Sequence, residues 1–271
     1  MKYILTESVR HLKIPSVKIH KEIFPEGELY IRITENLRNK PVTIITNITP
    51  MNILEVLFTV DAARRTGAKI KQIIIPFLSY ARQDKLYHAG EAVSGEVLCK
   101  LLKDLKIPIQ VINIHSERLQ KFRFRYTSVL PLLAKALPKK NWVIVSPDQG
   151  GAERAGEIAK LLKAPMTIIK KIRTQNRITM TFNQDCAGQS ILIVEDMIST
   201  GTTLTKAAAL LRNAKEIYCI SAHGLFVGNA REKLKKTGIK KILVSNTLPV
   251  KPSKQIQVIR IEKVLNTKKT S

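Results

Sequence analysis

Two acidic residues and a run of hydroxyl side chains follow one another closely between residues 195 and 203. Glu195 and Asp196 precede the turn Ser199-Thr200-Gly201-Thr202-Thr203 by two apolar residues. Backbone N–H groups and hydroxyls in such a turn bind phosphate well when a helix begins there. The two carboxylates can accept hydrogen bonds from sugar hydroxyls or hold a metal ion. The stretch therefore predicts a phosphate site beside an acidic pair.

The flanking residues predict the elements that position these groups. Residues 191–194 (ILIV) form the short apolar run of a buried parallel strand, and residues 204–214 (LTKAAALLRNA) predict a helix. The acids are then expected at the carboxyl end of the strand and the hydroxyl turn at the helix N-terminus. The alternative is an ordinary strand-to-helix turn with a threonine cap and solvated acids.

Polar groups also follow other predicted strands. Arg82, Gln83 and Asp84 come after the apolar run KQIIIPF, and His115 comes after IQVINI. A loop at the carboxyl end of a strand is where α/β proteins bind ligands. Arg82 offers a planar cation for phosphate or for stacking on a base. A lone histidine is more often structural than a ligand, so only its position after a strand marks His115 as a candidate.

Strand-like and helix-like segments alternate along the whole chain, which predicts an α/β protein with mainly parallel sheets flanked by helices. The pattern repeats after residue 135. We therefore predict two related domains, residues 1–135 and 136–271, with the last segment a candidate for packing back on the first domain. Neither a GxxxxGK[ST] motif nor a GxGxxG motif opening a helix is present, which disfavours a P-loop or a dinucleotide site.

Composition bounds the class of protein. The 271 residues are 44% hydrophobic, enough for a sizeable core. Three widely spaced cysteines fit neither a disulfide framework nor a zinc knuckle and favour a reducing cytoplasm. The first residues lack the apolar core of a signal peptide. No apolar run approaches the roughly 20 residues that span a membrane.

The net charge of +25 would attract any polyanion. The basic residues are spread along the chain, however, and the densest cluster, residues 233–241, resembles the solvated face and end of a helix. Aromatic residues make up 5% of the chain and form no stacking series. A solvated basic surface is therefore favoured over a nucleic-acid groove.

Six motifs occur in an order that is specific when taken together. They are FPEGE at 24–28, YARQD at 80–84, a strand ending in His115, VSPDQGG at 145–151, Lys171-Ile172-Arg173, and the acidic phosphate loop at 195–203. From about residue 20 to about residue 250 this series is similar to that of the ribose-phosphate diphosphokinase (phosphoribosyl diphosphate synthetase) family. The chain's length resembles that of the shorter archaeal-type forms. The resemblance implies two type I phosphoribosyltransferase-like domains.

This resemblance also implies a reaction. The family transfers the β,γ-diphosphoryl group of ATP to the C1 hydroxyl of ribose 5-phosphate, which gives phosphoribosyl diphosphate and AMP. It implies Mg²⁺ as the cofactor and a homo-oligomer, either a dimer or a hexamer. The first domain would lie on the ATP side, and the second would bind ribose 5-phosphate.

The family's site residues carry over motif by motif. The implied ATP site consists of Phe24, Glu26, Gly27 and Glu28, which reach into a neighbouring subunit, with Arg82, Gln83 and Asp84. The implied metal contacts are His115 and Asp148, and the implied catalytic residues are Lys171 and Arg173 on a mobile loop. The implied ribose 5-phosphate site consists of Glu195, Asp196, Ser199, Thr200, Gly201, Thr202 and Thr203, with Arg173 as a further contact.

Three positions depart from the family pattern and keep other functions open. Asn113 and Glu195 stand where aspartate is common, and Thr202 stands where glycine is common. One alternative is a phosphoribosyltransferase, which shares the 195–203 loop but needs neither FPEGE nor YARQD. A second is a non-catalytic regulatory homologue. A nucleic-acid-binding regulator on the same fold ranks lowest, because no added helix-turn-helix segment precedes residue 20.

Overall fold

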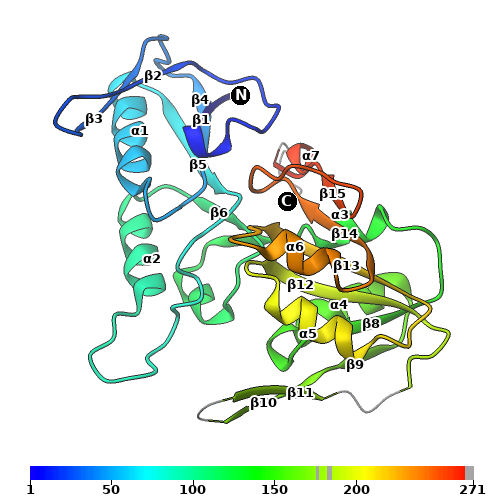
Figure 1. Cartoon of the computed structure of the whole chain (residues 1–271). Coiled ribbons are helices and arrows are strands. Elements are labelled where there is room, and N and C mark those ends of the chain that lie inside the picture. The colour runs from blue at the N-terminus through cyan, green and yellow to red at the C-terminus, as the bar shows by residue number, and fades with distance from the viewer. Residues whose placement is uncertain (175–176, 182–184, 266–271) are drawn as a thin grey trace. The chain divides into compact units, whose positions relative to one another are not determined.

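The chain divides into two compact units. The computed structural model describes residues 1–174, 177–181 and 185–265, and the side chains of these residues except at 171–179 (Figure 1). The first unit comprises Met1–Thr127 and Thr247–Pro249 and resumes at Glu262. The second comprises Ser128–Asn246 and Val250–Ile261. The assignment of one unit to ATP and the other to ribose 5-phosphate stays a prediction.

A five-stranded parallel sheet forms the centre of the first unit. Its order is β1-β4-β5-β6-β7, with bounds β1 (Lys2–Leu5), β4 (Pro41–Ile45), β5 (Lys69–Ile75), β6 (Ile109–Ile112) and β7 (Arg125–Thr127). The helices are α1 (Ile53–Arg65), α2 (Ser94–Asp104) and α7 (Glu262–Leu265), with short 3₁₀ turns at Glu7–Val9 and Glu117–Phe122. The β4 and β5 strands end in continuous buried isoleucines, as expected for a parallel sheet covered on both faces.

An antiparallel hairpin is added to this unit. It pairs β2 (Ile19–Ile23) with β3 (Leu29–Ile33), from Ile19 opposite Ile33 to Ile23 opposite Leu29. The FPEGE residues form its loop, in which the N–H of Phe24 donates to the carbonyl of Glu28 over 2.9 Å. Gly27 has a φ of +92°, a conformation that glycine adopts without strain.

One buried asparagine joins the later part of the chain to the first sheet. Asn47 is fully buried, and its Nδ2 donates to the carbonyl of Thr247 over 2.8 Å. Its Oδ1 accepts from the N–H of Phe77 over 2.9 Å. The N–H of Lys13 likewise donates to Oε1 of Glu262 over 3.1 Å. The C-terminal return of the chain is therefore fixed by hydrogen bonds within the first unit.

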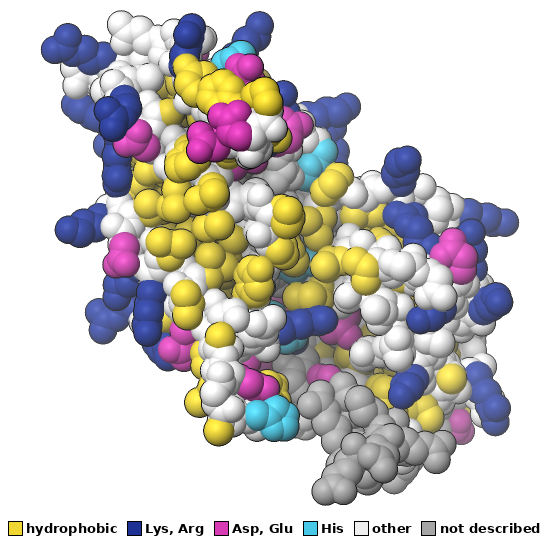
Figure 2. Space-filling view, turned by 60° about the vertical axis from the view of Figure 1, so that its left-hand side comes forward, with side chains coloured by type: hydrophobic (Ala, Val, Ile, Leu, Met, Phe, Trp, Pro, Cys, Tyr) yellow, Lys and Arg dark blue, Asp and Glu magenta, His cyan; other side chains and the backbone are white. Residues whose placement is uncertain are grey.

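Apolar side chains are exposed on the outer sides of two helices of the first unit. Leu54 and Phe58 lie one turn apart on α1, and Val97 and Leu101 lie one turn apart on α2. These four residues are called the apolar face below. Figure 2 shows hydrophobic side chains gathered across this side of the unit, with basic side chains around them. Adjacent exposed apolar groups of this kind are typical of an interaction surface.

The second unit contains a six-stranded parallel sheet in the order β15-β14-β13-β12-β8-β9. The strands are β8 (Trp142–Ser146), β9 (Met166–Ile168), β12 (Ser190–Ile198), β13 (Glu216–Gly224), β14 (Ile239–Ser245) and β15 (Ile256–Ile259). The helices are α3 (Leu130–Lys135), α4 (Ala152–Leu162), α5 (Thr202–Leu210) and α6 (Ala230–Lys235). An antiparallel hairpin pairs β10 (Lys170–Thr174) with β11 (Arg177–Thr181). The predicted α/β class with two mainly parallel sheets is confirmed.

No helix in the described ranges combines the length and the apolar character that a membrane crossing requires.

A partly buried glutamate joins the amino-terminal ends of three strands in the second sheet. Glu216 of β13 accepts hydrogen bonds from Lys140, from Nζ of Lys240 over 2.9 Å and from Oγ of Ser190 over 3.0 Å. The hydrogen bond from Lys140, followed by that from Lys240, lowers the pKa of Glu216 to about 2. The native state thus holds this carboxylate ionised more firmly than an unfolded chain would.

Replacing Glu216 should make the free energy of unfolding less dependent on pH. A folded pKa of about 2, below the ordinary value of 4.5, means that the stabilisation is complete above about pH 4.5 and is lost as the pH falls towards 2. We expect Glu216→Gln to lower the free energy of unfolding by about 1–2 kcal/mol at pH 7, with a smaller difference at pH 3. Urea unfolding at several pH values measures this. Glu232→Gln, at an exposed position of α6, is the control.

Candidate functional site

The two acids lie inside β12, whereas the sequence predicted a strand ending at Val194. The strand pairs with β13 as far as Ile198 opposite Gly224, but with β8 only as far as Ile193 opposite Val145. Glu195 and Asp196 therefore lie beyond the paired end of β8. The carboxyl ends of parallel strands meet at one edge of a sheet, so the turn after β8 reaches this same place.

Three carboxylates gather at this edge. Asp196 is almost fully buried. Burial raises the pKa of Glu195 well above its ordinary value, the charge of Asp196 raises it further, and Asp148 adds to the effect. Arg154 of α4 acts in the opposite direction. Hydroxyl donors would relieve this crowding of negative charge, so the edge suits a sugar.

A tight turn positions Asp148 beside these acids. Its Oδ1 accepts from the N–H of Gly151 over 3.2 Å, and Oγ of Ser146 donates to its carbonyl over 2.7 Å. A Cβ at Gly151 would lie 2.7 Å from that same Oγ, which is closer than real Cβ atoms come. The VSPDQGG motif therefore needs glycine at its last position to bring the start of α4 against the turn.

The hydroxyl turn leads into a helix N-terminus, as predicted, although α5 begins at Thr202 rather than Leu204. Gly201 is the N-cap with a φ of +73° and makes no side-chain cap hydrogen bond. Because glycine has no side chain that could cap the helix, the N–H groups of the first turn are suited to bind an anion. Oγ1 of Thr200 lies 3.1 Å from Oγ1 of Thr202.

Thr202 fits the local backbone. The positive φ falls on Gly201, and Thr202 is not among the positive-φ residues but begins the helix. Threonine in place of the more common glycine therefore costs no left-handed strain here. Thr202 is exposed and Thr203 is partly exposed, so both hydroxyls are accessible from solvent.

A second loop lies at the carboxyl edge of the first sheet. Arg82 and Gln83 are exposed. The carboxylate of Asp84 accepts from the hydroxyl of Ser116, and Nε of Arg118 lies 4.0 Å from its Oδ2. Gly95 lets the start of α2 lie against this loop, because a Cβ there would lie 2.9 Å from the carbonyl oxygen of Tyr80. Ser116 and Arg118 were missed from the sequence; their position just after His115 was the available signal.

Asn113 also suits its position. It has a φ of +45° between β6 and His115, and its N–H donates to the carbonyl of Thr127 over 3.0 Å. Asparagine is one of the few residues with a side chain that tolerate this conformation. The change from the more common aspartate removes a charge near the partly exposed His115 but keeps the backbone turn.

The predicted ATP-binding residues fall at two places in the first unit. Figure 1 shows the β2–β3 hairpin near the outer end of α1, whereas the loop after β5 lies beside α2 at the opposite end. Phe24, Glu26, Gly27 and Glu28 are thus not brought together with Arg82, Gln83 and Asp84 within this unit. The two groups are separate surfaces of one chain.

The remaining predicted residues are placed only in part. Lys171 and Arg173 belong to β10, and their side chains lie outside the described residues. His115 belongs to the first unit and Asp148 to the second. Within the described part of the chain, no group of three or more His, Cys, Asp or Glu side chains is arranged to hold a metal ion.

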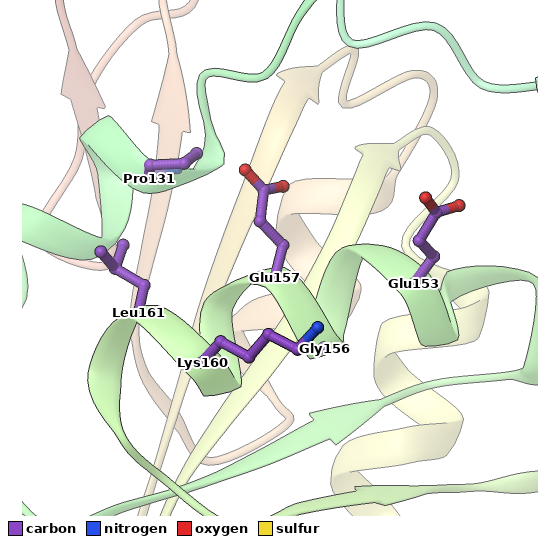
Figure 3. Close-up of a pocket in the computed structure, with 6 residues that line it drawn as sticks. All are labelled: Pro131, Glu153, Gly156, Glu157, Lys160 and Leu161. Atoms are coloured by element: carbon purple, nitrogen blue, oxygen red, sulfur yellow. The ribbon is translucent and has the colours of Figure 1, made fainter.

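A groove elsewhere in the second unit is lined by two acidic residues and one basic residue. It has a volume of about 710 Å³ and is lined by Pro131, Glu153, Gly156, Glu157, Lys160 and Leu161. Figure 3 shows the carboxylates of Glu153 and Glu157 projecting from the same side of α4. None of the predicted site residues lines it. Two carboxylates would repel phosphate, so the groove is not part of the candidate site.

Comparisons with known proteins cover both units. Residues 2–105 match the N-terminal domain of ribose phosphate pyrophosphokinase, and residues 130–254 match the phosphoribosyl transferase domain. The chain is 34% identical to ribose-phosphate pyrophosphokinase of Mycoplasma pneumoniae, over 91% of this chain and 81% of that protein. It is 33% identical to that of Saccharolobus solfataricus, over 88% and 87%.

A solved structure agrees with these matches. The crystal structure of phosphoribosylpyrophosphate synthetase from Mycobacterium smegmatis superposes with a TM-score of 0.83 at 28% identity, covering 98% of this chain and 96% of that one. Relatives from bacteria and archaea are of similar identity, so a special closeness to archaeal forms stays a prediction.

Gly201→Ala tests the geometry of the hydroxyl turn. A Cβ at Gly201 would have both a positive φ and a contact of 3.2 Å with Cγ of Leu234 on α6. Gly228→Ala is the matched control, because it has a φ of +58° and nothing within 4 Å. We expect about 1 kcal/mol of destabilisation at Gly228 and about 2–3 kcal/mol at Gly201 in urea unfolding. Equal losses would mean that packing against Leu234 is unimportant.

Proposed function

Because this chain belongs to the ribose-phosphate pyrophosphokinase family, we propose that it transfers the β,γ-diphosphoryl group of ATP to the C1 hydroxyl of ribose 5-phosphate. The products are phosphoribosyl diphosphate and AMP. The observation that carries this proposal is the match of both units to one enzyme over nearly the whole chain. The match of residues 2–105 favours it over a phosphoribosyltransferase.

The second unit is the proposed ribose 5-phosphate site. The 5-phosphate of the substrate binds at the N-terminus of α5, where Ser199–Thr203 offer backbone N–H groups and hydroxyls. Glu195 accepts hydrogen bonds from the ribose hydroxyls, with Asp196 beside it. The raised pKa of Glu195 supports this role, since hydroxyl donors stabilise the ionised form of a crowded carboxylate.

The loop after β5 is the proposed nucleotide site. Arg82 binds the nucleotide through its planar cation, and Gln83 provides amide hydrogen bonds. Asp84 is held by the hydroxyl of Ser116, so its carboxylate is fixed before the nucleotide arrives. Phe24, Glu26, Gly27 and Glu28 complete the adenine site of a neighbouring copy of the chain, because in their own unit they lie away from this loop (Figure 1).

Magnesium is the proposed cofactor, with His115 and Asp148 as its contacts. Carboxylate oxygens are the ligands that Mg²⁺ prefers, which supports Asp148 as a contact. When bound, the ion neutralises negative charge on the transferring phosphates. The residues of the chain bind and orient the two substrates around it.

Lys171 and Arg173 are the proposed catalytic residues. They belong to the β10–β11 hairpin of the second unit, two residues apart on one strand. Both would stabilise the negative charge that develops on the phosphoryl oxygens, and Arg173 would also contact ribose 5-phosphate.

A homo-oligomer, either a dimer or a hexamer, is the proposed assembly. The apolar face of α1 and α2 supports it, because a second copy would cover these exposed side chains. The separate location of the FPEGE loop supports it as well. The three cysteines, Cys99, Cys186 and Cys219, are buried and free, which supports the proposed cytoplasmic location.

The activity is tested with purified protein, ATP, ribose 5-phosphate and Mg²⁺. We expect AMP and phosphoribosyl diphosphate to appear one for one and to require the metal. Formation of ADP instead of AMP would indicate an ordinary kinase and contradict the proposal. Absence of turnover, with ribose 5-phosphate still bound, would favour the non-catalytic homologue.

Lys171→Ala tests the catalytic assignment. A cation that meets the phosphoryl oxygens mainly in the transition state should affect kcat more than ground-state binding. We expect kcat to fall by about 10²–10³-fold or more, with the KM for ATP nearly unchanged. Lys170→Ala, at the exposed neighbouring position, is the control. Equal, small effects at both positions would show that the catalytic loop is elsewhere.

A further inference from the structure

The β2–β3 hairpin is held to α1 by a buried glutamate. Glu55 lies in the first turn of α1 with its side chain only 7% exposed. Its Oε2 accepts from Nζ of Lys21 on β2 over 3.1 Å, and its Oε1 accepts from the N–H of Glu7 over 2.9 Å. One carboxylate therefore joins three segments: the helix, the hairpin and the turn after β1.

Lys21 occupies the middle of the hairpin. The end near Ile19 and Ile33 packs on the core of the unit, whereas the loop end is exposed at Ile23 and Phe24. Lys21 pairs with Ile31, between these two ends. Its ammonium therefore binds Glu55 at a point of the hairpin between the packed base and the solvent-exposed FPEGE loop.

The other face of β2 is organised differently. Successive side chains of a strand alternate in direction, so His20 and Glu22 face away from Lys21. His20 lies edge-on to the ring of Tyr30 at 5.9 Å, and Tyr30 lies 5.8 Å from Phe24. The aromatic row thus runs along one face towards Phe24, while the ion pair fixes the opposite face to α1.

We propose that the Lys21–Glu55 ion pair is a positioning device that fixes the direction of the FPEGE loop and thereby sets the affinity for ATP, with no comparable effect on ribose 5-phosphate. Lys21 and Glu55 are positioning residues that act through the hairpin. The inference rests on the proposed role of Phe24, Glu26 and Glu28 in ATP binding. The physical basis is that a loop ordered before its ligand arrives loses less conformational freedom on binding.

The two single variants separate the ion pair from the rest of the network. Lys21→Met keeps the aliphatic length but removes the charge. Glu55→Gln keeps an acceptor oxygen for the N–H of Glu7 and removes both the negative charge and the oxygen that accepts from Lys21. We expect each to raise the KM for ATP about tenfold with the KM for ribose 5-phosphate within about twofold. The double variant should be no worse than either single one, because both remove the same interaction.

Two further variants serve as controls. Lys21→Arg should restore most of the affinity for ATP, because it returns the cation to Glu55. Lys18→Met changes an exposed lysine just before the hairpin and should behave like the wild type. Equal rises in the KM values of both substrates, with a lowered melting temperature, would show a purely structural role and overturn the inference.

Amide hydrogen exchange of the ligand-free protein provides a readout that does not depend on activity. In Lys21→Met, exchange at residues 20–31 should become several-fold faster, with the core strands β4 and β5 unchanged. Unchanged exchange in the hairpin would overturn the inference even if the enzyme is confirmed. Faster exchange with an unchanged KM for ATP would overturn the link between the hairpin and ATP. If the wild type proved inactive, exchange alone would test the anchoring.

Discussion

The placement of Glu195 beside Asp196 and Asp148, at one edge of the sheet, is the constraint on which the site of the second unit depends. Burial and like charges raise the pKa of Glu195, and Arg154 opposes the effect only in part. Carboxylates crowded in this way are unfavourable in the absence of donors or cations. The carboxylates lie together because β8 and β12 end at the same edge of the sheet. Stability and ligand binding are therefore linked: what neutralises this edge should also stabilise the unit.

The backbone around the candidate sites depends on glycine at particular positions. Gly151 lets the turn after β8 close onto Ser146, Gly201 takes the left-handed conformation before α5, and Gly95 admits the carbonyl of Tyr80. Gly151 and Gly95 each bring the start of a helix close to a loop at the end of a strand, whereas Gly201 brings the start of α5 close to α6. The same device is thus used in both units, in agreement with the internal repeat of strands and helices.

Much of this arrangement could be predicted because it depends on local sequence patterns, namely apolar runs and short motifs. Apolar runs gave the strands, and the ordered motifs gave the candidate residues. The prediction that β12 ends at Val194 was wrong, because pairing with β13 carries the strand through the acids to Ile198. Local sequence could not show that β8 stops earlier than β13. Nor could it join Lys21 to Glu55 or Asp84 to Ser116, which lie more than 30 residues apart.

The way the chain returns to its first unit has a consequence for dissecting the protein. Asn47 depends on the carbonyl of Thr247, and the N–H of Lys13 depends on Glu262, although more than half of the chain intervenes. A fragment that stops at Thr127 would lack both partners, and the buried Nδ2 of Asn47 would keep only its 3.4 Å hydrogen bond to the carbonyl of Ser8. The units are compact in space but interleaved in sequence. Exchange of one unit between relatives therefore needs three splice points near the C-terminus, after Asn246, Pro249 and Ile261, as well as one in the middle.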